Sequence, residues 1–247
     1  MQTNLVHFTW IVSAVLIILL AVALGRLIRR DWLGILVDSR GRYSLTQLQI
    51  AVWTIVILSL ISGVFWARIL TGTAGALDFT MPDELLLVMG ISIGSTAAAI
   101  AVKAGKDAAR PAAIAASDAG EPRRLSQIFL VEEGEFADQI VDVTKFQSFW
   151  ITGILVVAYV ALAVSAIGAA GTPAALTALP GFSGTFVTLL GISHAGYLAG
   201  KIPDRPGTPK GLSLQMMRHG AVAILPGGGP TAIFPGAVTY QPRTTRP

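Results

Sequence analysis

Long apolar runs alternate with polar segments along the chain. Five of these runs are about 20 residues long and cover approximately residues 6–25, 47–70, 84–103, 147–169 and 182–200. A helix needs about 20 apolar residues to cross the hydrocarbon core of a bilayer, because that core is about 30 Å thick. The pattern therefore predicts an α-helical integral membrane protein with five transmembrane helices.

The second half of the chain resembles the first. Residues of the first half recur at a spacing of 98 in three cases: Thr46 as Thr144, Gln49 as Gln147 and Thr54 as Thr152. The stretches 35–38 and 87–92 likewise resemble 129–132 and 188–193. Membrane proteins are often built from internal repeats. We therefore expect two parallel repeats related by a pseudo-two-fold axis along the membrane normal.

Each repeat is predicted to begin with a cytoplasmic β-hairpin and to continue with two helices. Apolar residues flank short turns at 38–41 and 132–135, and each turn contains an acidic residue and a glycine. Ser44 and Asp142 then carry side chains suited to cap the next helix. The full division is an N-terminal transmembrane anchor at 1–30, repeat 1 at 31–104, a cytoplasmic linker at 105–124, repeat 2 at 125–201 and an extended Pro/Gly-rich cytoplasmic tail at 202–247.

Composition and charge placement agree with membrane insertion and indicate its direction. The chain is 53% hydrophobic and 13% charged, against about 25% charged residues in soluble domains. Apart from Arg68, its Lys and Arg residues fall in the segments 26–46, 103–146 and 201–247. Because positive charge marks the cytoplasmic side, we predict an uncleaved anchor with its N-terminus outside the plasma (inner) membrane and a cytoplasmic C-terminus. Arg68 is expected to reach toward Asp78, Asp83 or Glu84.

The second helix of each predicted repeat is rich in small residues. Glycines in such helices let two backbones approach closely. We therefore expect the helices 84–103 and 182–200 to pair at the centre, with the first helices flanking them and the helix 6–25 outside. The positions predicted to form close helix contacts are Gly90, Gly94, Gly191 and Gly196.

Polar side chains within these same helices form the candidate site. They are Ser92, Ser95, Thr96, Ser193 and His194. An ionisable residue inside a membrane is a functional candidate, so they either line a narrow path or hold the helix pair together by hydrogen bonds. Gln49 and Gln147, at the predicted cytoplasmic border, either form a ring in an oligomer or cap and solvate their helices.

The sequence contains no signature of an enzyme. The chain has no cysteine, which excludes disulfides and thiolate chemistry, and no nucleophile–base pair, metal cluster or phosphate-binding loop is recognisable. We therefore expect no cofactor, no metal and no nucleic-acid partner.

The tail offers apolar residues for docking, namely Ile224, Ile233, Phe234 and Tyr240. An apolar segment interrupted by proline and glycine cannot form a regular spanning helix, and exposed apolar patches often mark interaction sites. The first hypothesis is a non-enzymatic scaffold or assembly component that docks partners, or copies of itself, through the hairpins and the tail. The alternative is a homo-oligomeric channel or small-solute or ion transporter lined by the Gly-Ile-Ser helices.

Overall fold

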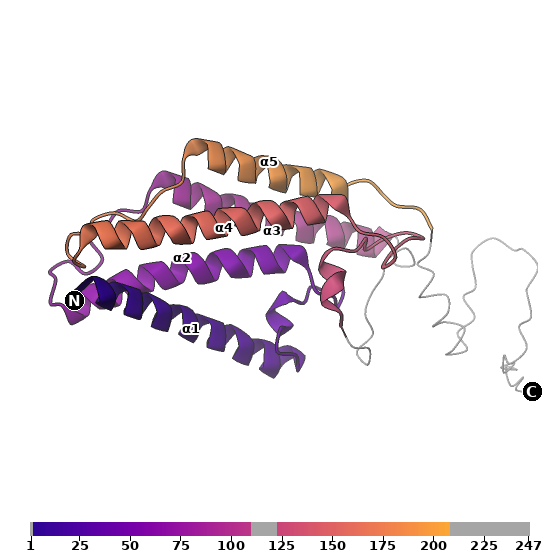
Figure 1. The fold of residues 1–247 in the computed structure, drawn as a ribbon. Helices are drawn as coiled ribbons and strands as arrows, with labels where there is room; N and C mark the ends of the chain where they lie inside the picture. Colours follow the sequence, from indigo (N-terminus) through magenta and orange to yellow (C-terminus); the bar gives the residue numbers. More distant parts are fainter. Residues whose placement is uncertain (1, 110–122, 208–247) are drawn as a thin grey trace, which may run out of the picture.

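Five long helices lie side by side in the computed structural model, which describes residues 2–109 and 123–207 (Figure 1). Within these residues there is no β-strand, and two short 3-10 helices occupy the connections. The elements are α1 (Gln2–Arg29), η1 (Gly34–Leu36), α2 (Leu45–Leu70), α3 (Asp83–Ala109), η3 (Leu125–Ile128), α4 (Val143–Ala170) and α5 (Gly184–Lys201).

Four of these helices, α1 to α4, are long and apolar enough to cross a membrane. The prediction of a helical membrane protein is confirmed at this level. The fifth helix, α5, is not among these four candidate spans. Its 18 residues extend about 27 Å at 1.5 Å per residue. They include several glycines, His194 and Lys201, which lower its apolar character.

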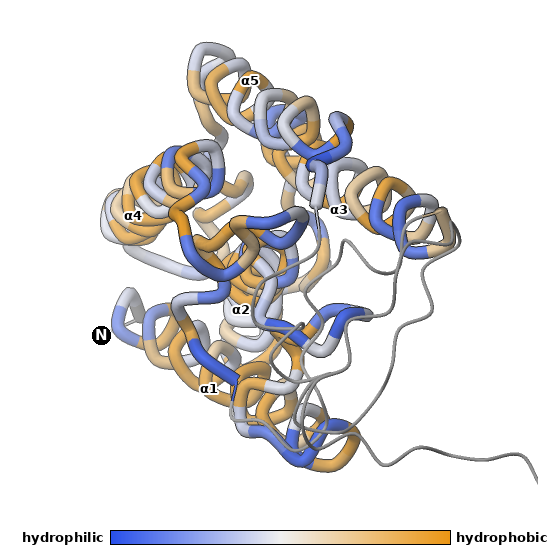
Figure 2. Tube along the Cα trace, turned by 90° about the vertical axis from the view of Figure 1, so that its right-hand side faces the viewer, coloured by the Kyte–Doolittle hydropathy of each residue, from blue (hydrophilic) through white to orange (hydrophobic). Residues whose placement is uncertain are grey.

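The centre of the bundle is occupied by α2, with α1, α3 and α4 around it (Figure 2). Its large buried side chains fill the middle, among them Trp53, Ile57 and Leu60. Leu155 and Tyr159 of α4 belong to the same core. The prediction that the small-residue helices take the centre is therefore wrong. They do pack against each other, as α3 and α5, but at the side of the bundle (Figure 2).

Neither predicted hairpin forms a two-stranded ladder. After η1 the chain makes a single antiparallel bridge between Val37 and Tyr43, and after η3 it makes one between Leu130 and Val141. The second loop is longer than expected, since the predicted return at Phe136 is replaced by the bridge at Val141. Isolated hairpins are marginal in water, and ion pairs hold these loops instead.

The predicted helix caps have different outcomes. Asp142 caps α4, because its carboxylate accepts hydrogen bonds from the N–H groups of Thr144 at 3.1 Å and Lys145 at 3.5 Å. Ser44 occupies the position before α2, but its side chain makes no cap hydrogen bond. The first half of the chain therefore begins its core helix without the side-chain cap expected at Ser44.

The tightest glycine contacts lie elsewhere than predicted. A Cβ atom built on Gly90, Gly94 or Gly196 would meet no atom within 4 Å, and on Gly191 it would meet only the Ile91 side chain at 3.8 Å. These four glycines therefore make no close helix contact within the described chain, which corrects the prediction. Close backbone approach occurs instead at Gly63, where a Cβ would lie 2.5 Å from the Cα of Trp10.

Candidate functional site: a buried ionic cluster and the polar pairs of the bundle

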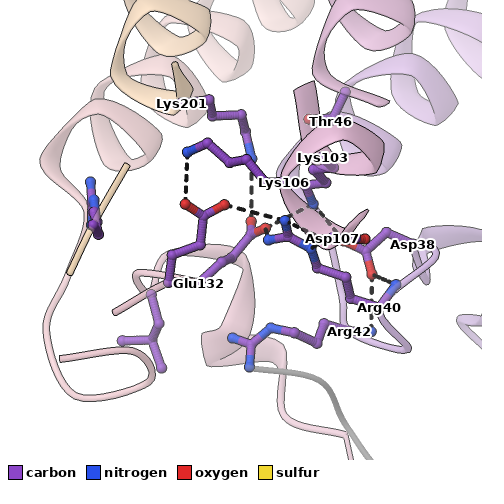
Figure 3. Close-up of polar contacts among 12 residues, drawn as sticks. Asp38, Arg40, Arg42, Thr46, Lys103, Lys106, Asp107, Glu132 and Lys201 are labelled. Carbon is purple, nitrogen blue, oxygen red and sulfur yellow. Dashed lines mark hydrogen bonds and ion pairs between the residues drawn. The ribbon is translucent and has the colours of Figure 1, made fainter. Parts of the chain in front are cut away.

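Charged side chains from both halves of the chain meet at the end of the bundle where α3 and α5 terminate (Figure 3). They come from the two loops that precede α2 and α4, from the last turns of α3 and α5, and from the first turn of α4. We call this group the ionic cluster; its members are Asp38, Arg40, Lys103, Lys106, Asp107, Glu132, Glu133, Lys145 and Lys201.

Glu132 is the central anion of the ionic cluster. Its Oε1 atom accepts from Lys145 at 2.6 Å and lies 3.4 Å from Lys201. Its Oε2 atom lies 2.9 Å from Lys103 and 3.2 Å from Arg40. Burial by itself would raise the pKa of Glu132, but the surrounding lysines hold it well below its usual range. One carboxylate thus connects four separate segments of the chain.

Asp38 holds the first loop in place. One oxygen accepts from the Lys103 ammonium, and the other accepts from the N–H groups of Arg40 at 2.9 Å and Arg42 at 3.2 Å. The Arg42 guanidinium forms a two-pronged pair with Asp138 of the second loop. The two loops are therefore joined to each other directly as well as to the helices.

Arg40 connects the first loop to α3 and to the second loop. Its guanidinium pairs with Asp107 at 2.7 Å and with Glu133 at 3.2 Å, in addition to Glu132. These three carboxylates keep the pKa of Arg40 above its ordinary value despite the burial of the side chain. Lys106 completes this side by pairing with Glu133 at 2.7 Å. Each charged member of the ionic cluster thus has an opposite charge beside it.

Such a network is suited to fixing geometry. Buried charges are costly to desolvate, so a paired set contributes more to selecting one arrangement than to net stability. Removing one partner, by contrast, leaves the remaining buried charges without compensation. The ionic cluster therefore holds the two loops in a fixed arrangement against the helix ends.

The opposite end of the bundle is held by a single buried arginine. Arg68 donates to the backbone carbonyls of Pro173 at 3.1 Å, Asp78 at 2.9 Å and Leu176 at 3.1 Å. It also donates to the carbonyl of Gly75 at 3.1 Å. Arg68 thus reaches Asp78, one of the three residues expected, but it bonds to the backbone carbonyl and not to the carboxylate. The two loops that carry these carbonyls also meet in a parallel bridge between Thr80 and Ala178.

Inside the bundle, the predicted polar residues gather where α3 meets α5. The Ser95 Oγ atom lies 2.6 Å from the Nδ1 atom of His194 and donates to the Ser92 carbonyl at 3.0 Å. The donor in the bond between Ser95 and His194 depends on which tautomer the ring adopts. Thr96 also donates to the Ser92 carbonyl, at 2.8 Å. The Nε2 atom of His194 and the Oγ atoms of Ser92 and Ser193 are buried with no partner among the described residues.

The two border glutamines occupy different environments. Gln49 is buried and donates from Nε2 to Ser148 Oγ at 2.9 Å and to Thr152 Oγ1 at 2.8 Å, which joins α2 to α4. Gln147 is exposed on α4. The structure therefore does not bring the two glutamines together within the chain.

Sequence reasoning missed the ionic cluster. Asp38, Glu132 and Glu133 were interpreted as turn residues, and the lysines only as markers of the cytoplasmic side. A usable signal was present in the spacing, since Lys103 and Lys201 stand 98 residues apart at the ends of corresponding helices. The predicted docking residues Ile224, Ile233, Phe234 and Tyr240 lie outside the described residues.

Comparisons with protein-family models, with curated proteins and with solved structures find no match to this chain.

Proposed function

We propose that this chain is a non-enzymatic scaffold or assembly component of the inner membrane. The observation that carries the proposal is the filled centre of the bundle. Trp53, Ile57, Leu155 and Tyr159 are each at most 2% exposed and belong to one continuous apolar core. A core packed with large side chains is suited to rigidity, which supports a structural role for the bundle.

Contacts within and between the two halves support an architecture of two parallel repeats at 31–104 and 125–201. In each half, the acidic residue of the loop pairs with the lysine at the end of the second helix: Asp38 with Lys103, and Glu132 with Lys201. Thr80 and Ala178, which form a bridge, are themselves 98 residues apart. In this proposal α5 is the fifth span, and its counterpart is α3.

The proposed orientation places the ionic cluster in the cytoplasm and the N-terminus outside. It rests on the excess of Lys and Arg at the end of the bundle that contains the ionic cluster. Arg68 at the other end is the exception, and its burial among carbonyl groups explains how one cation is accommodated there.

Partners or further copies of the chain are proposed to dock at this same end. Residues leading into the tail are attached to the second loop: the Glu135 N–H donates to the Pro206 carbonyl at 3.1 Å, and Arg205 pairs with Asp142 at 3.3 Å. Lys106 also donates to the Pro203 carbonyl at 2.9 Å. Residues 203–206 are thus held beside the ionic cluster.

The alternative function is a homo-oligomeric channel or transporter. One observation favours it: His194 Nε2 and the hydroxyls of Ser92 and Ser193 are buried without a partner among the described residues. Unsatisfied buried polar atoms require an explanation. These three groups lie where α3 meets α5, so a path built on them would follow that side of the bundle.

Truncation after Gly207 tests the scaffold proposal. This end point retains the contacts of Arg205 and Pro206, which a cut after Pro203 would remove. The truncated and full-length chains should be extracted from membranes in equal amounts, but cross-linking should capture larger assemblies with the full chain alone. A matched control replaces Ile224, Ile233, Phe234 and Tyr240 with serine in the full chain and should behave like the truncation. Equal assembly by all three proteins would contradict docking through the tail.

A further inference from the structure

The last turns of α1 and the loop that follows form a tightly folded corner. A Cβ atom on Gly34 would lie 2.6 Å from the Gly25 carbonyl oxygen, so the loop returns onto the helix at van der Waals contact. This return brings Trp32 beside the helix, with its ring centroid 5.1 Å from the Arg26 guanidinium carbon. Arg30 has a positive φ of 55° and makes the turn. The chain thus folds back onto the end of α1 at this corner.

Three arginines are exposed at this corner without a counter-ion. Arg26, Arg29 and Arg30 have no carboxylate within ion-pair distance in the described part of the chain, and Arg26 donates instead to the Arg30 carbonyl at 2.9 Å. The nearby Asp31 faces away from them. Its carboxylate accepts from Tyr43 at 2.8 Å and from Arg123 at 3.1 Å. The one acid of this segment is thus already engaged, and three positive charges stay uncompensated.

Exposed apolar side chains accompany these arginines. Leu27 is 80% exposed, Ile28 is 71% exposed and Trp32 is 64% exposed. They continue the exposed apolar surface of α1, and the candidate span ends at Arg29. Tryptophan and arginine are typical of the level where the hydrocarbon core gives way to headgroups. The exposed apolar side chains thus lie at the same end of α1 as the three arginines.

We infer that Arg26, Arg29, Arg30 and Trp32 form a binding site for the headgroup phosphate of an anionic phospholipid. Guanidinium groups pair with phosphate oxygens through two parallel hydrogen bonds, and three such groups match a lipid that carries net negative charge. The continuity of Leu27 and Ile28 with the apolar surface of α1 selects a lipid, whose acyl chains would cover them, over a soluble anion. This inference concerns a surface separate from the ionic cluster and the tail, so it does not depend on the scaffold proposal.

Lipid binding by the full-length protein in detergent tests this site. Phosphatidylglycerol and phosphatidylcholine with identical acyl chains would be added in equal amounts, and retained lipid would be counted by native mass spectrometry. The parent should retain phosphatidylglycerol preferentially. The triple variant R26Q/R29Q/R30Q should bind it about 100-fold more weakly, since each arginine near an anionic surface contributes about a fivefold change in affinity. The matched control R218Q/R243Q/R246Q removes the same charge from the tail and should bind like the parent.

Three results would overturn the inference. They are an absence of preference in the parent, an equal loss in both triple variants, and unchanged binding by R26Q/R29Q/R30Q. Equal loss would indicate general attraction to a basic protein, and unchanged binding would leave the arginines as partners of the helix dipole only. A second readout on the parent protects against misfolding of the variant. Its preference for phosphatidylglycerol should fall as salt rises from 50 to about 500 mM, because exposed charges are screened.

Discussion

The two ends of the bundle join the same two halves of the chain by different chemistry. At one end, Glu132 holds Arg40, Lys103, Lys145 and Lys201 through opposite charges. At the other end, Arg68 holds two loops through backbone carbonyls and has no carboxylate partner among the described residues.

This difference in chemistry predicts that the two ends respond differently to pH and to the removal of one charged group. A charge network depends on the protonation of its carboxylates and loses its balance when one member is removed. A guanidinium stays protonated at any ordinary pH, so bonds from Arg68 to carbonyls persist in acid. We therefore expect the stability of the ionic-cluster end to depend on pH, and that of the Arg68 end not to.

Removing the central anion should have the largest effect. Glu132→Gln leaves four cations without their shared carboxylate, and breaking a buried ion pair in this way costs about 3–5 kcal/mol. The expected loss appears in the free energy of unfolding, measured by denaturant titration in detergent micelles. Glu133→Gln makes the same chemical change at a residue that pairs with only Arg40 and Lys106, so its loss should be smaller. Equal losses would contradict the central place of Glu132.

Replacing Arg68 should cause the next largest loss in the free energy of unfolding, and the size of this loss should not depend on pH. Arg68→Lys keeps the charge, but an ammonium cannot reach carbonyls on two loops in the way a planar guanidinium does. An ammonium has three donors for the four carbonyls that Arg68 reaches at 2.9–3.1 Å, so one is left without a donor at a cost of about 1–3 kcal/mol. The exposed Arg124 provides the control, because Arg124→Lys should change stability by less than about 0.5 kcal/mol. A loss for Arg68→Lys that disappears at high pH or high salt would contradict the carbonyl account.

The middle of the bundle, between the two ends, can be tested with one pair of glycines. Gly63→Leu places a side chain against the Trp10 backbone, and overpacking costs about 1–3 kcal/mol. Gly94→Leu enters open space on α3 and should be tolerated within the chain. Thermal unfolding in the same detergent compares the two. If Gly94→Leu lowered the unfolding temperature more than Gly63→Leu, the original prediction of a close helix contact at Gly94 would be supported.

Mild acid should produce the smallest effect and should act through the ionic cluster. Because the pKa of folded Glu132 is held below that of the unfolded chain, its contribution is complete above about pH 4.5 and is lost as pH falls through the folded value. Lowering the pH from 7 to 4 should therefore reduce stability only slightly in the parent, with a steeper loss below that. Glu132→Gln should lack this steeper component, and Arg68→Lys should keep it.

The sequence predicted the coarse fold and missed the features that depend on three-dimensional packing. Apolar run length located α1 to α4 correctly, and local chemistry identified Asp142 as a helix cap. Residue size at Gly94 and Gly191 suggested close contacts, but size alone does not reveal which face of a helix meets a neighbour. The ionic cluster joins residues up to 93 positions apart, and pairing at that distance is set by the fold.

The site showed the same limit. Ser95 and His194 were both candidates, but only the structure joined them, through a bond between α3 and α5. Gln49 and Gln147 looked equivalent in sequence, yet one is buried against α4 and the other is exposed. Arg68 was expected to reach toward Asp78, Asp83 or Glu84, and it does bond to the Asp78 carbonyl. Its bonds to the carbonyls of Pro173 and Leu176 could not be predicted, because carbonyl groups of distant loops leave no trace in sequence patterns.

Solute flux across a membrane containing the purified chain tests the filled centre most directly. The protein would be reconstituted into vesicles loaded with a pH-sensitive dye and with potassium, and proton and potassium flux would be recorded with an imposed gradient. A packed scaffold predicts flux equal to that of empty vesicles for both the parent and His194→Ala. Flux by the parent that rises with the protein-to-lipid ratio and is abolished in His194→Ala would contradict the scaffold and favour a path beside α3 and α5.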